Sequence, residues 1–176
     1  MFRTYTAEAI IIKRINLNEA DRLLTIFAKN YGKKKIMAKG VRRLTSRKKG
    51  HLELFNQARL FIAKGKKIDL VTEVKTINNF PDLRKNLSSV RIAYLFAELI
   101  DQLTAEEQEN NQAYQLLVSN LSQLNQARIN KNIIIDFEKN LLQILGFGLP
   151  KTITKQSLES HIASITEKPL NSKKIR

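Results

Sequence analysis

Short apolar runs, several with the two-residue alternation of β-strands, fill the first eighty residues of this chain. Glycines that permit tight turns, such as Gly32 and Gly65, separate the runs. In the last run, Leu70, Thr72 and Val74 are expected to share one face. The predicted strands cover residues 9–12, 23–27, 36–38, 52–63 and 68–77. Five short strands with glycine-bearing turns favour a small closed barrel, and the OB-fold is the five-stranded barrel most often used on nucleic acid.

After residue 80 the apolar spacing changes to three and four, which is typical of amphipathic helices. Pro81 marks the change, because proline disfavours helical backbone at the preceding residue and can itself open a helix. Gly146 and the following Pro150 end the third helix. The predicted helices carry the apolar stripes 92–103, 114–124, 129–145 and 158–165. The sequence therefore predicts an α+β protein with an N-terminal five-stranded OB-fold β-barrel over 1–79 and a C-terminal helical bundle over 80–176.

A dense basic run lies between Lys33 and Lys49, with nine basic residues in seventeen positions and no acidic one. So many like charges cannot be desolvated together, so we expect them on the surface. Such a surface suits a polyanion, above all nucleic acid, because each neutralised phosphate releases a condensed counterion. A solvated loop that keeps the protein soluble is the alternative. The predicted DNA-binding residues are Lys33, Lys34, Lys35, Lys39, Arg42, Arg43, Arg47, Lys48 and Lys49.

The charge is uneven along the 176 residues, whose formal net charge is +15. The first eighty residues hold 19 of the 31 basic residues but only 6 of the 16 acidic ones. This asymmetry indicates one electrostatic module and one that is close to neutral. With 43% hydrophobic residues the chain can bury a core, which excludes a wholly disordered tail.

The residue types exclude several kinds of chemistry. Cysteine is absent, which excludes disulfides and cysteine-ligated zinc or iron–sulfur sites, and no P-loop motif occurs. His51 and His161 are isolated, as surface histidines usually are. Glu19 and Asp21 are spaced to hold a divalent metal, but the adjacent Arg22 favours a structural turn or ion pair. We therefore expect no enzymatic activity, no cofactor, no metal and no small-molecule substrate.

Aromatic residues that stack on bases are the other usual feature of single-strand binders. Phe27 and Phe61 lie in apolar runs, which favours core packing for both. Tyr31 beside Gly32 suits stacking on a base and a structural role equally well. Phe55 is a further candidate for stacking on a base.

Several segments, in this order, resemble the RecO family of bacterial recombination mediators. In the predicted barrel they are Glu19–Thr25, Tyr31–Lys33, Ala38–Arg43 and Ser46–Leu52. In the predicted helical domain they are Phe80–Arg84, Tyr94–Asp101, Leu145–Phe147 and Lys168–Ser172. One departure is clear: many RecO proteins insert a four-cysteine zinc ribbon after the third helix, whereas here Leu149–Lys151 leads directly into the last helical segment.

The resemblance implies an OB-fold packed on a helical domain, which binds single- and double-stranded DNA without sequence specificity and anneals complementary strands without ATP. It also implies docking onto the acidic C-terminal tail of single-stranded DNA-binding protein, and loading of RecA together with RecR. That tail needs an apolar groove edged by cations. The candidate cations are Arg84, Lys85, Arg91, Arg128, Lys131 and Lys139.

Three other interpretations remain open for the sequence. A generic basic OB-fold module for RNA or the ribosome shares the same charge pattern. A nuclease that uses Glu19 and Asp21 is a second alternative, and a binder of anionic membranes is a third. The N-terminal residues lack the apolar core of a signal peptide and no apolar stretch approaches the roughly 20 residues of a membrane span, so we expect a cytoplasmic, nucleoid-associated location without a membrane partner.

Overall fold

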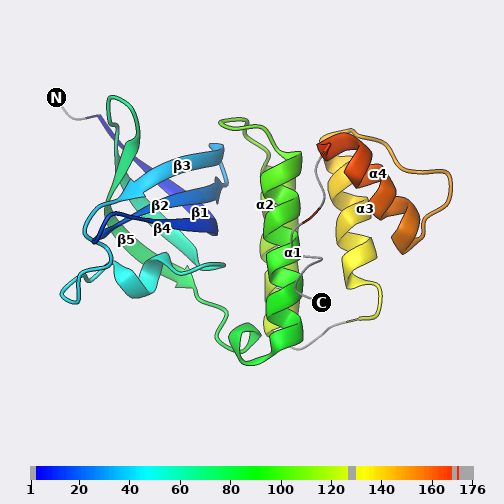
Figure 1. The fold of residues 1–176 in the computed structure, drawn as a ribbon, viewed down its shortest axis with the longest axis horizontal. Coiled ribbons are helices and arrows are strands. Elements are labelled where there is room, and N and C mark those ends of the chain that lie inside the picture. Colours follow the sequence, from blue (N-terminus) through cyan, green and yellow to red (C-terminus); the bar gives the residue numbers. More distant parts are fainter. Residues whose placement is uncertain (1–2, 127–129, 168–169, 171–176) are drawn as a thin grey trace. The chain divides into compact units, whose positions relative to one another are not determined.

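The computed structural model describes residues 3–126, 130–167 and 170, and it divides the chain into two compact units (Figure 1). The first unit contains Met1–Asn79 together with Ala105–Asn111, and the second contains Phe80–Thr104 and Gln112–Arg176. The segment Ala105–Asn111, here called the acidic segment, thus belongs with the N-terminal residues, although a helix of the second unit separates it from them in the sequence. The domain limits 1–79 and 80–176 remain a prediction.

The first unit is a closed five-stranded barrel, as predicted, with the strand order β1-β2-β3-β5-β4. The strands are β1 (Thr4–Leu17), β2 (Asp21–Ala28), β3 (Gly32–Ala38), β4 (Gln57–Ala63) and β5 (Asp69–Asn78). Neighbouring strands pair antiparallel except for β3 and β5, whose short parallel contact closes the barrel. Closure removes the free sheet edges and gives an OB-fold.

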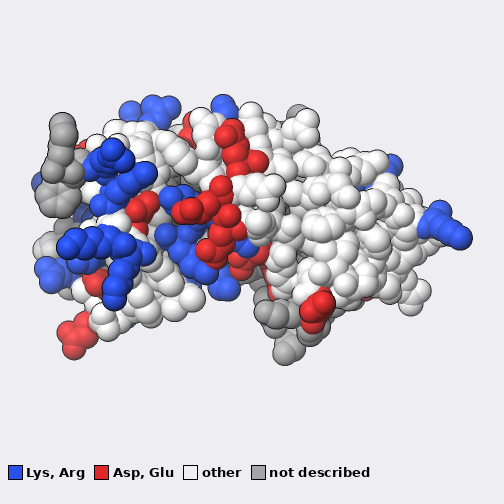
Figure 2. All heavy atoms as spheres, turned by 90° about the horizontal axis from the view of Figure 1, so that it is seen from above, with Lys and Arg blue, Asp and Glu red and all other residues white. Residues whose placement is uncertain are grey.

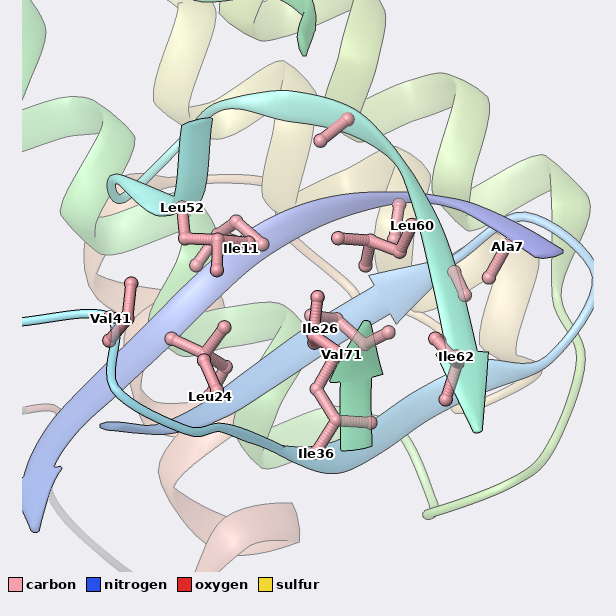
Figure 3. Close-up of a cluster of buried hydrophobic side chains, with 14 residues drawn as sticks. Ala7, Ile11, Leu24, Ile26, Ile36, Val41, Leu52, Leu60, Ile62 and Val71 are labelled. Carbon is pink, nitrogen blue, oxygen red and sulfur yellow. The ribbon is translucent and has the colours of Figure 1, made fainter. Parts of the chain in front are cut away.

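The barrel interior is filled by aliphatic side chains from all five strands (Figure 3). Ile11, Leu24, Ile26 and Ile36 are fully buried there, and so are Leu60 and Ile62 of β4. Val41 and Leu52 enter the same core from outside the strands. Burial of these side chains is the main favourable term in forming the barrel.

The observed strands differ in length from the predicted ones. The fourth predicted strand, 52–63, is two elements, because Lys49–Leu52 forms a short 3-10 helix (η1) and β4 begins only at Gln57. Phe55 interrupts the run with a φ of 69°, and the side chain of Asn56 donates to the carbonyls of Gly50 and His51. The first strand extends over 14 residues, well beyond the predicted 9–12.

The predicted face of β5 is wrong. The pairing of β4 with β5 shifts register between Phe61 and Ile62, so both Thr72 and Glu73 are exposed on β5. Val71 and Val74 point into the barrel, whereas Thr72 does not. An extra residue in one strand reverses the alternation beyond it, which strict two-residue spacing cannot anticipate.

The described residues of the second unit form four helices: α1 (Leu87–Leu103), α2 (Asn111–Asn125), α3 (Ile133–Leu145) and α4 (Lys155–Thr166). Apolar faces hold the helices together, and the rings of Phe96 and Phe137 stack with centroids 3.9 Å apart. Gly146 ends α3 with a φ of 77°, which confirms the predicted glycine cap. Pro81 does not open α1, because a 3-10 turn (η2, Leu83–Lys85) follows it and Asn86 caps the helix instead. Ile129, expected in the third helix, lies outside the described residues.

Candidate nucleic-acid interface

The nine predicted DNA-binding residues fall into two groups of different character. Three of them, the β3 lysines Lys33, Lys34 and Lys35, lie on strand β3. The other six lie between β3 and the end of η1, in the stretch 39–49 that we call the basic loop. Figure 2 shows Lys and Arg side chains gathered over the barrel, with Asp and Glu among them.

Carboxylates of the same unit engage the β3 lysines. The Lys34 Nζ lies 3.2 Å from Asp69 Oδ2 and 3.2 Å from Glu107 Oε1, and the Lys35 Nζ lies 2.5 Å from Glu106 Oε1. The backbone of the acidic segment reinforces these pairs, because the Glu107 amide donates to the Lys33 carbonyl at 2.8 Å. Lys33 itself is only 8% exposed. Lys33 and Lys34 are therefore less accessible to an external anion than the exposed arginines of the basic loop, whereas Lys35 is exposed but paired with Glu106.

A small polar network around Lys34 ties β1, β3 and β5 together. The Tyr5 hydroxyl donates to Asp69 Oδ2 at 2.7 Å, and burial together with this bond raises the pKa of Tyr5 to about 12. Burial alone would lower the pKa of Lys34, but hydrogen bonds with Tyr5, Asp69 and Glu107 raise it above its ordinary value. Burial alone would raise the pKa of Asp69. Hydrogen bonds from Tyr5, the Gly65 amide and Lys34 outweigh burial and lower that pKa below its ordinary value. Lys34 is thus held protonated and Asp69 ionised.

The basic loop is anchored at its start by Ala20 of the β1–β2 turn and by Asp21, the first residue of β2. The Gly40 amide donates to Asp21 Oδ1 at 2.7 Å, and the Arg42 amide donates to the Ala20 carbonyl at 2.9 Å. The buried Val41 side chain packs in the barrel core between these two bonds. Asp21 therefore positions the loop, in agreement with the structural role favoured by the sequence. No group of three or more potential metal-ligating side chains occurs among the residues that the structure describes.

Beyond this anchor, the basic loop borders a groove of about 560 Å³ against β5. Lys39, Arg43, Arg47 and Lys48 line the loop side of the groove, and Thr72–Val74 line the other side. The far end of the loop is fixed by Lys48 Nζ, which donates to the Val71 carbonyl at 3.2 Å, and by a 2.7 Å bond between His51 Nδ1 and Thr76 Oγ1. Forked guanidinium donors and mobile ammonium groups around an open groove suit phosphate oxygens.

Other cations of the barrel are engaged elsewhere. Arg14 and Arg22 both pair with Glu53, with Arg22 Nη1 and Glu53 Oε1 3.2 Å apart. Arg42 Nη1 donates to the Asn18 carbonyl at 2.8 Å. By contrast, Arg43 and Arg47 are exposed, and neither forms an ion pair with another described residue.

The burial of the aromatic side chains agrees with the prediction for Phe27 but not with that for Phe61. Phe27 is fully buried, as predicted, and Phe55 is buried too. The prediction for Phe61 is wrong, because 40% of it is exposed on β4. The alternation of buried Ala58, Leu60 and Ile62 carried the signal that Phe61 points outward. Tyr31, 37% exposed, has its ring 4.9 Å from that of Tyr5.

The predicted cations of the helical domain are spread over its surface. Arg84, Lys85, Arg91 and Lys131 are exposed, Lys139 is half-buried, and Arg128 lies outside the described residues. A cavity of about 300 Å³ lies between α2 and α3, and its lining is largely polar and contains no Lys or Arg of the described chain. This cavity therefore does not match the expected apolar groove edged by cations. Within the described residues no helix is both long and apolar enough to cross a bilayer.

Comparison with known proteins gives matches over both units. Residues 1–80 match the family model described as the N-terminal part of recombination protein O, and residues 84–152 match that of its C-terminal part. A DNA repair protein RecO from Roseiflexus sp. is 39% identical over 145 residues, which is 82% of this chain and 51% of the relative. Proteins of the same name from Pelotomaculum thermopropionicum and Dehalococcoides mccartyi are both 34% identical, over 66% and 81% of this chain and 45% and 56% of the relatives. The chain thus spans about half the length of the curated relatives it matches.

Proposed function

This chain belongs to the RecO family, and from that premise we propose that it binds single- and double-stranded DNA without sequence specificity in recombinational DNA repair. The observation that carries the proposal is the groove beside β5, with Lys39, Arg43, Arg47 and Lys48 along the basic loop. These side chains suit phosphate oxygens, which are the same in every sequence. The β3 lysines contribute less directly, because carboxylates of the acidic segment and Asp69 already engage Lys34 and Lys35.

We further propose that the basic loop promotes annealing of complementary strands without ATP. Two single strands repel each other through their phosphates, and a dense cationic surface screens that repulsion. The exposed side chains of Arg43, Arg47 and Lys49 supply such a surface without taking part in the fold. Screening requires no bond cleavage, so the proposed activity is not enzymatic.

The proposed partners follow from family membership. They are RecR, the acidic C-terminal tail of single-stranded DNA-binding protein, and RecA as the protein that is loaded. A nucleoid-associated location in the cytoplasm accompanies this role. The helical unit is the proposed site for the tail, with the exposed Arg84, Lys85 and Arg91 as candidate cations.

The test is an annealing assay with complementary strands coated by cognate single-stranded DNA-binding protein, either intact or without its C-terminal tail. We expect this chain to accelerate annealing of the coated strands only when the tail is present. Acceleration that does not depend on the tail would remove the partner from the proposal. Absence of acceleration on both coated and bare strands would overturn the annealing function.

Two further measurements separate this function from the remaining alternatives. Labelled DNA incubated with the protein and Mg²⁺ or Mn²⁺ is expected to stay intact, whereas cleavage would favour the nuclease that uses Glu19 and Asp21. Competition between DNA and RNA strands of the same sequence tests the RNA-binding module. A strong preference for RNA would favour that alternative.

A further inference from the structure

The outward face of β4 carries an exposed aromatic residue that the groove does not use. Leu60 and Ile62 are fully buried in the barrel, so the residue between them, Phe61, points away from the core. Phe61 is 40% exposed. A single exposed phenylalanine is ordinary on a protein surface, so its neighbours decide whether it belongs to a site.

Those neighbours include a pair of like charges. Arg59 on β4 and Lys75 on β5 are directly opposite each other in the antiparallel register, and both are exposed. Like charges directly opposite on paired strands are destabilising. Neither side chain has an ion pair with any other residue that the structure describes, so no direct ion pair offsets this repulsion. An anion between the two cations would offset it.

Two carboxylates lie near this pair without forming an ion pair with it. Glu8 on β1 lies opposite Arg59, and its Oε1 accepts a hydrogen bond from the Gln57 side chain at 3.1 Å. Glu73 lies opposite Phe61 and is exposed. Glu73 also lines the groove beside the basic loop, so the outward face of β4 and β5 continues into that groove.

We propose that Arg59, Phe61 and Lys75 form a subsite for one nucleotide of a single strand, with the base stacked on Phe61 and a phosphate between the two cations. The proposal rests on the function proposed above and adds a base contact to its phosphate contacts. Residues two apart on a strand share a face at a separation of about 6.6 Å, so Arg59 and Phe61 are placed to contact adjoining parts of one nucleotide. An aromatic face accepts any base, which preserves the lack of sequence specificity. The subsite selects single strands, because the bases of a duplex are already stacked on one another.

The aromatic contact is tested by Phe61→Ala against the matched control Phe147→Ala, which removes an equally exposed phenylalanine from the helical unit. Binding is measured by fluorescence anisotropy with labelled oligothymidylate, with an abasic strand of the same length and with a duplex. We expect Phe61→Ala to weaken binding to oligothymidylate about tenfold and to leave the other two probes unchanged. Phe147→Ala is expected to change none of the three. The selective loss cannot come from unfolding, which would weaken all probes.

The cationic pair is tested by the double variant Arg59→Ala/Lys75→Ala against Lys151→Ala/Lys155→Ala, which removes two exposed lysines from the helical unit. With oligothymidylate the first variant is expected to make the slope of log K against log salt shallower by about 0.7, the value for one phosphate on a single strand, and the control is expected to leave it unchanged. Glu73→Gln is expected to strengthen binding, because it removes a negative charge beside the bound strand.

The outcomes separate the subsite from the proposed function. The proposed subsite is wrong if Phe61→Ala binds oligothymidylate as tightly as Phe147→Ala does. It is also wrong if Phe61→Ala weakens binding to the abasic strand as much as binding to oligothymidylate. The same holds if Glu73→Gln weakens binding or if the two double variants share one salt slope. In each of these cases the groove and the proposed function stand as long as the unaltered chain binds DNA. If the unaltered chain binds none of the probes, the proposed function fails as well.

Discussion

At the scale of single residues, Gly32 shows how closely two distant parts of the first unit approach each other. A Cβ at this position would lie 2.0 Å from the Gln108 carbonyl oxygen, and the backbone has a φ of +63°. We expect Gly32→Ala to lower the free energy of unfolding by about 2 kcal/mol or more, from the clash and the left-handed backbone together. Gly50→Ala is the matched control, because an added Cβ there meets nothing within 4 Å. Equal urea midpoints for the two variants would contradict this close packing.

The ionised Asp69 is a second single-residue determinant of stability. The pKa of Asp69 is lower in the folded protein than in the unfolded chain. Its contribution to the free energy of unfolding is therefore fully present above its pKa in the unfolded chain, and it is lost as the pH falls through its pKa in the folded protein. We expect Asp69→Asn to cost about 1–3 kcal/mol near neutral pH and progressively less below about pH 4. The measurement is urea unfolding over this pH range. The control Glu19→Gln alters an exposed carboxylate and is expected to change the free energy of unfolding little. If the loss of stability in Asp69→Asn does not depend on pH, the stabilising role of the ionised Asp69 is refuted.

At the scale of elements, the basic loop is expected to dominate the salt dependence of DNA binding. Arg43 and Arg47 are the most informative pair to change, because both line the groove and neither holds the loop in place. If each contacts one phosphate, Arg43→Ala/Arg47→Ala makes the single-strand salt slope shallower by about 1.4. The control Lys151→Ala/Lys155→Ala removes the same charge and is expected to leave the slope unchanged. Equal slopes for the two variants would place the phosphate path elsewhere.

Annealing provides an independent readout of the same loop. Replacing Arg42, Arg43, Arg47, Lys48 and Lys49 by Ala is expected to slow annealing of bare strands, because the cationic screen is lost. An unchanged annealing rate would falsify the screening mechanism. Thermal unfolding of this variant is needed beside the rate, since Arg42 and Lys48 also donate to backbone carbonyls.

The acidic segment is the second element with a predicted electrostatic effect. Glu106 forms an ion pair with Lys35 and Glu107 forms one with Lys34, so a phosphate must compete with these carboxylates for the two lysines. We expect Glu106→Gln/Glu107→Gln to tighten DNA binding and to steepen the salt slope by up to about 1.4 on single strands. Glu19→Gln/Glu109→Gln removes two exposed carboxylates and serves as the control. If both double variants bind alike, the β3 lysines do not meet DNA.

At the scale of the whole molecule, the sequence predicted the fold class, but it did not show which basic side chains pair with carboxylates of the same unit. The five strands and four helices follow from local patterns, such as Leu60 and Ile62 at two-residue spacing and Gly146 after the third helix. The bulge opposite Phe61 depends on pairing with β5, which no local pattern contains. The contacts of Lys34 and Lys35 with Glu107 and Glu106 join residues more than seventy positions apart, so the basic run alone could not show which of its charges are engaged.

This division of the basic run predicts a reactivity pattern for lysines across both units. Lys34 is expected to be acetylated slowly in the free protein, because its side chain is 15% exposed and its raised pKa leaves little neutral amine. Lys39 and Lys49 are exposed and are expected to react quickly, then to become protected when a single strand is bound, together with Lys75. Lys151 and Lys155 are expected to react equally with and without DNA. Mass spectrometry after brief acetylation measures every site in one experiment. Protection of Lys151 and Lys155 instead of Lys39 and Lys49 would move the DNA path from the barrel to the helices.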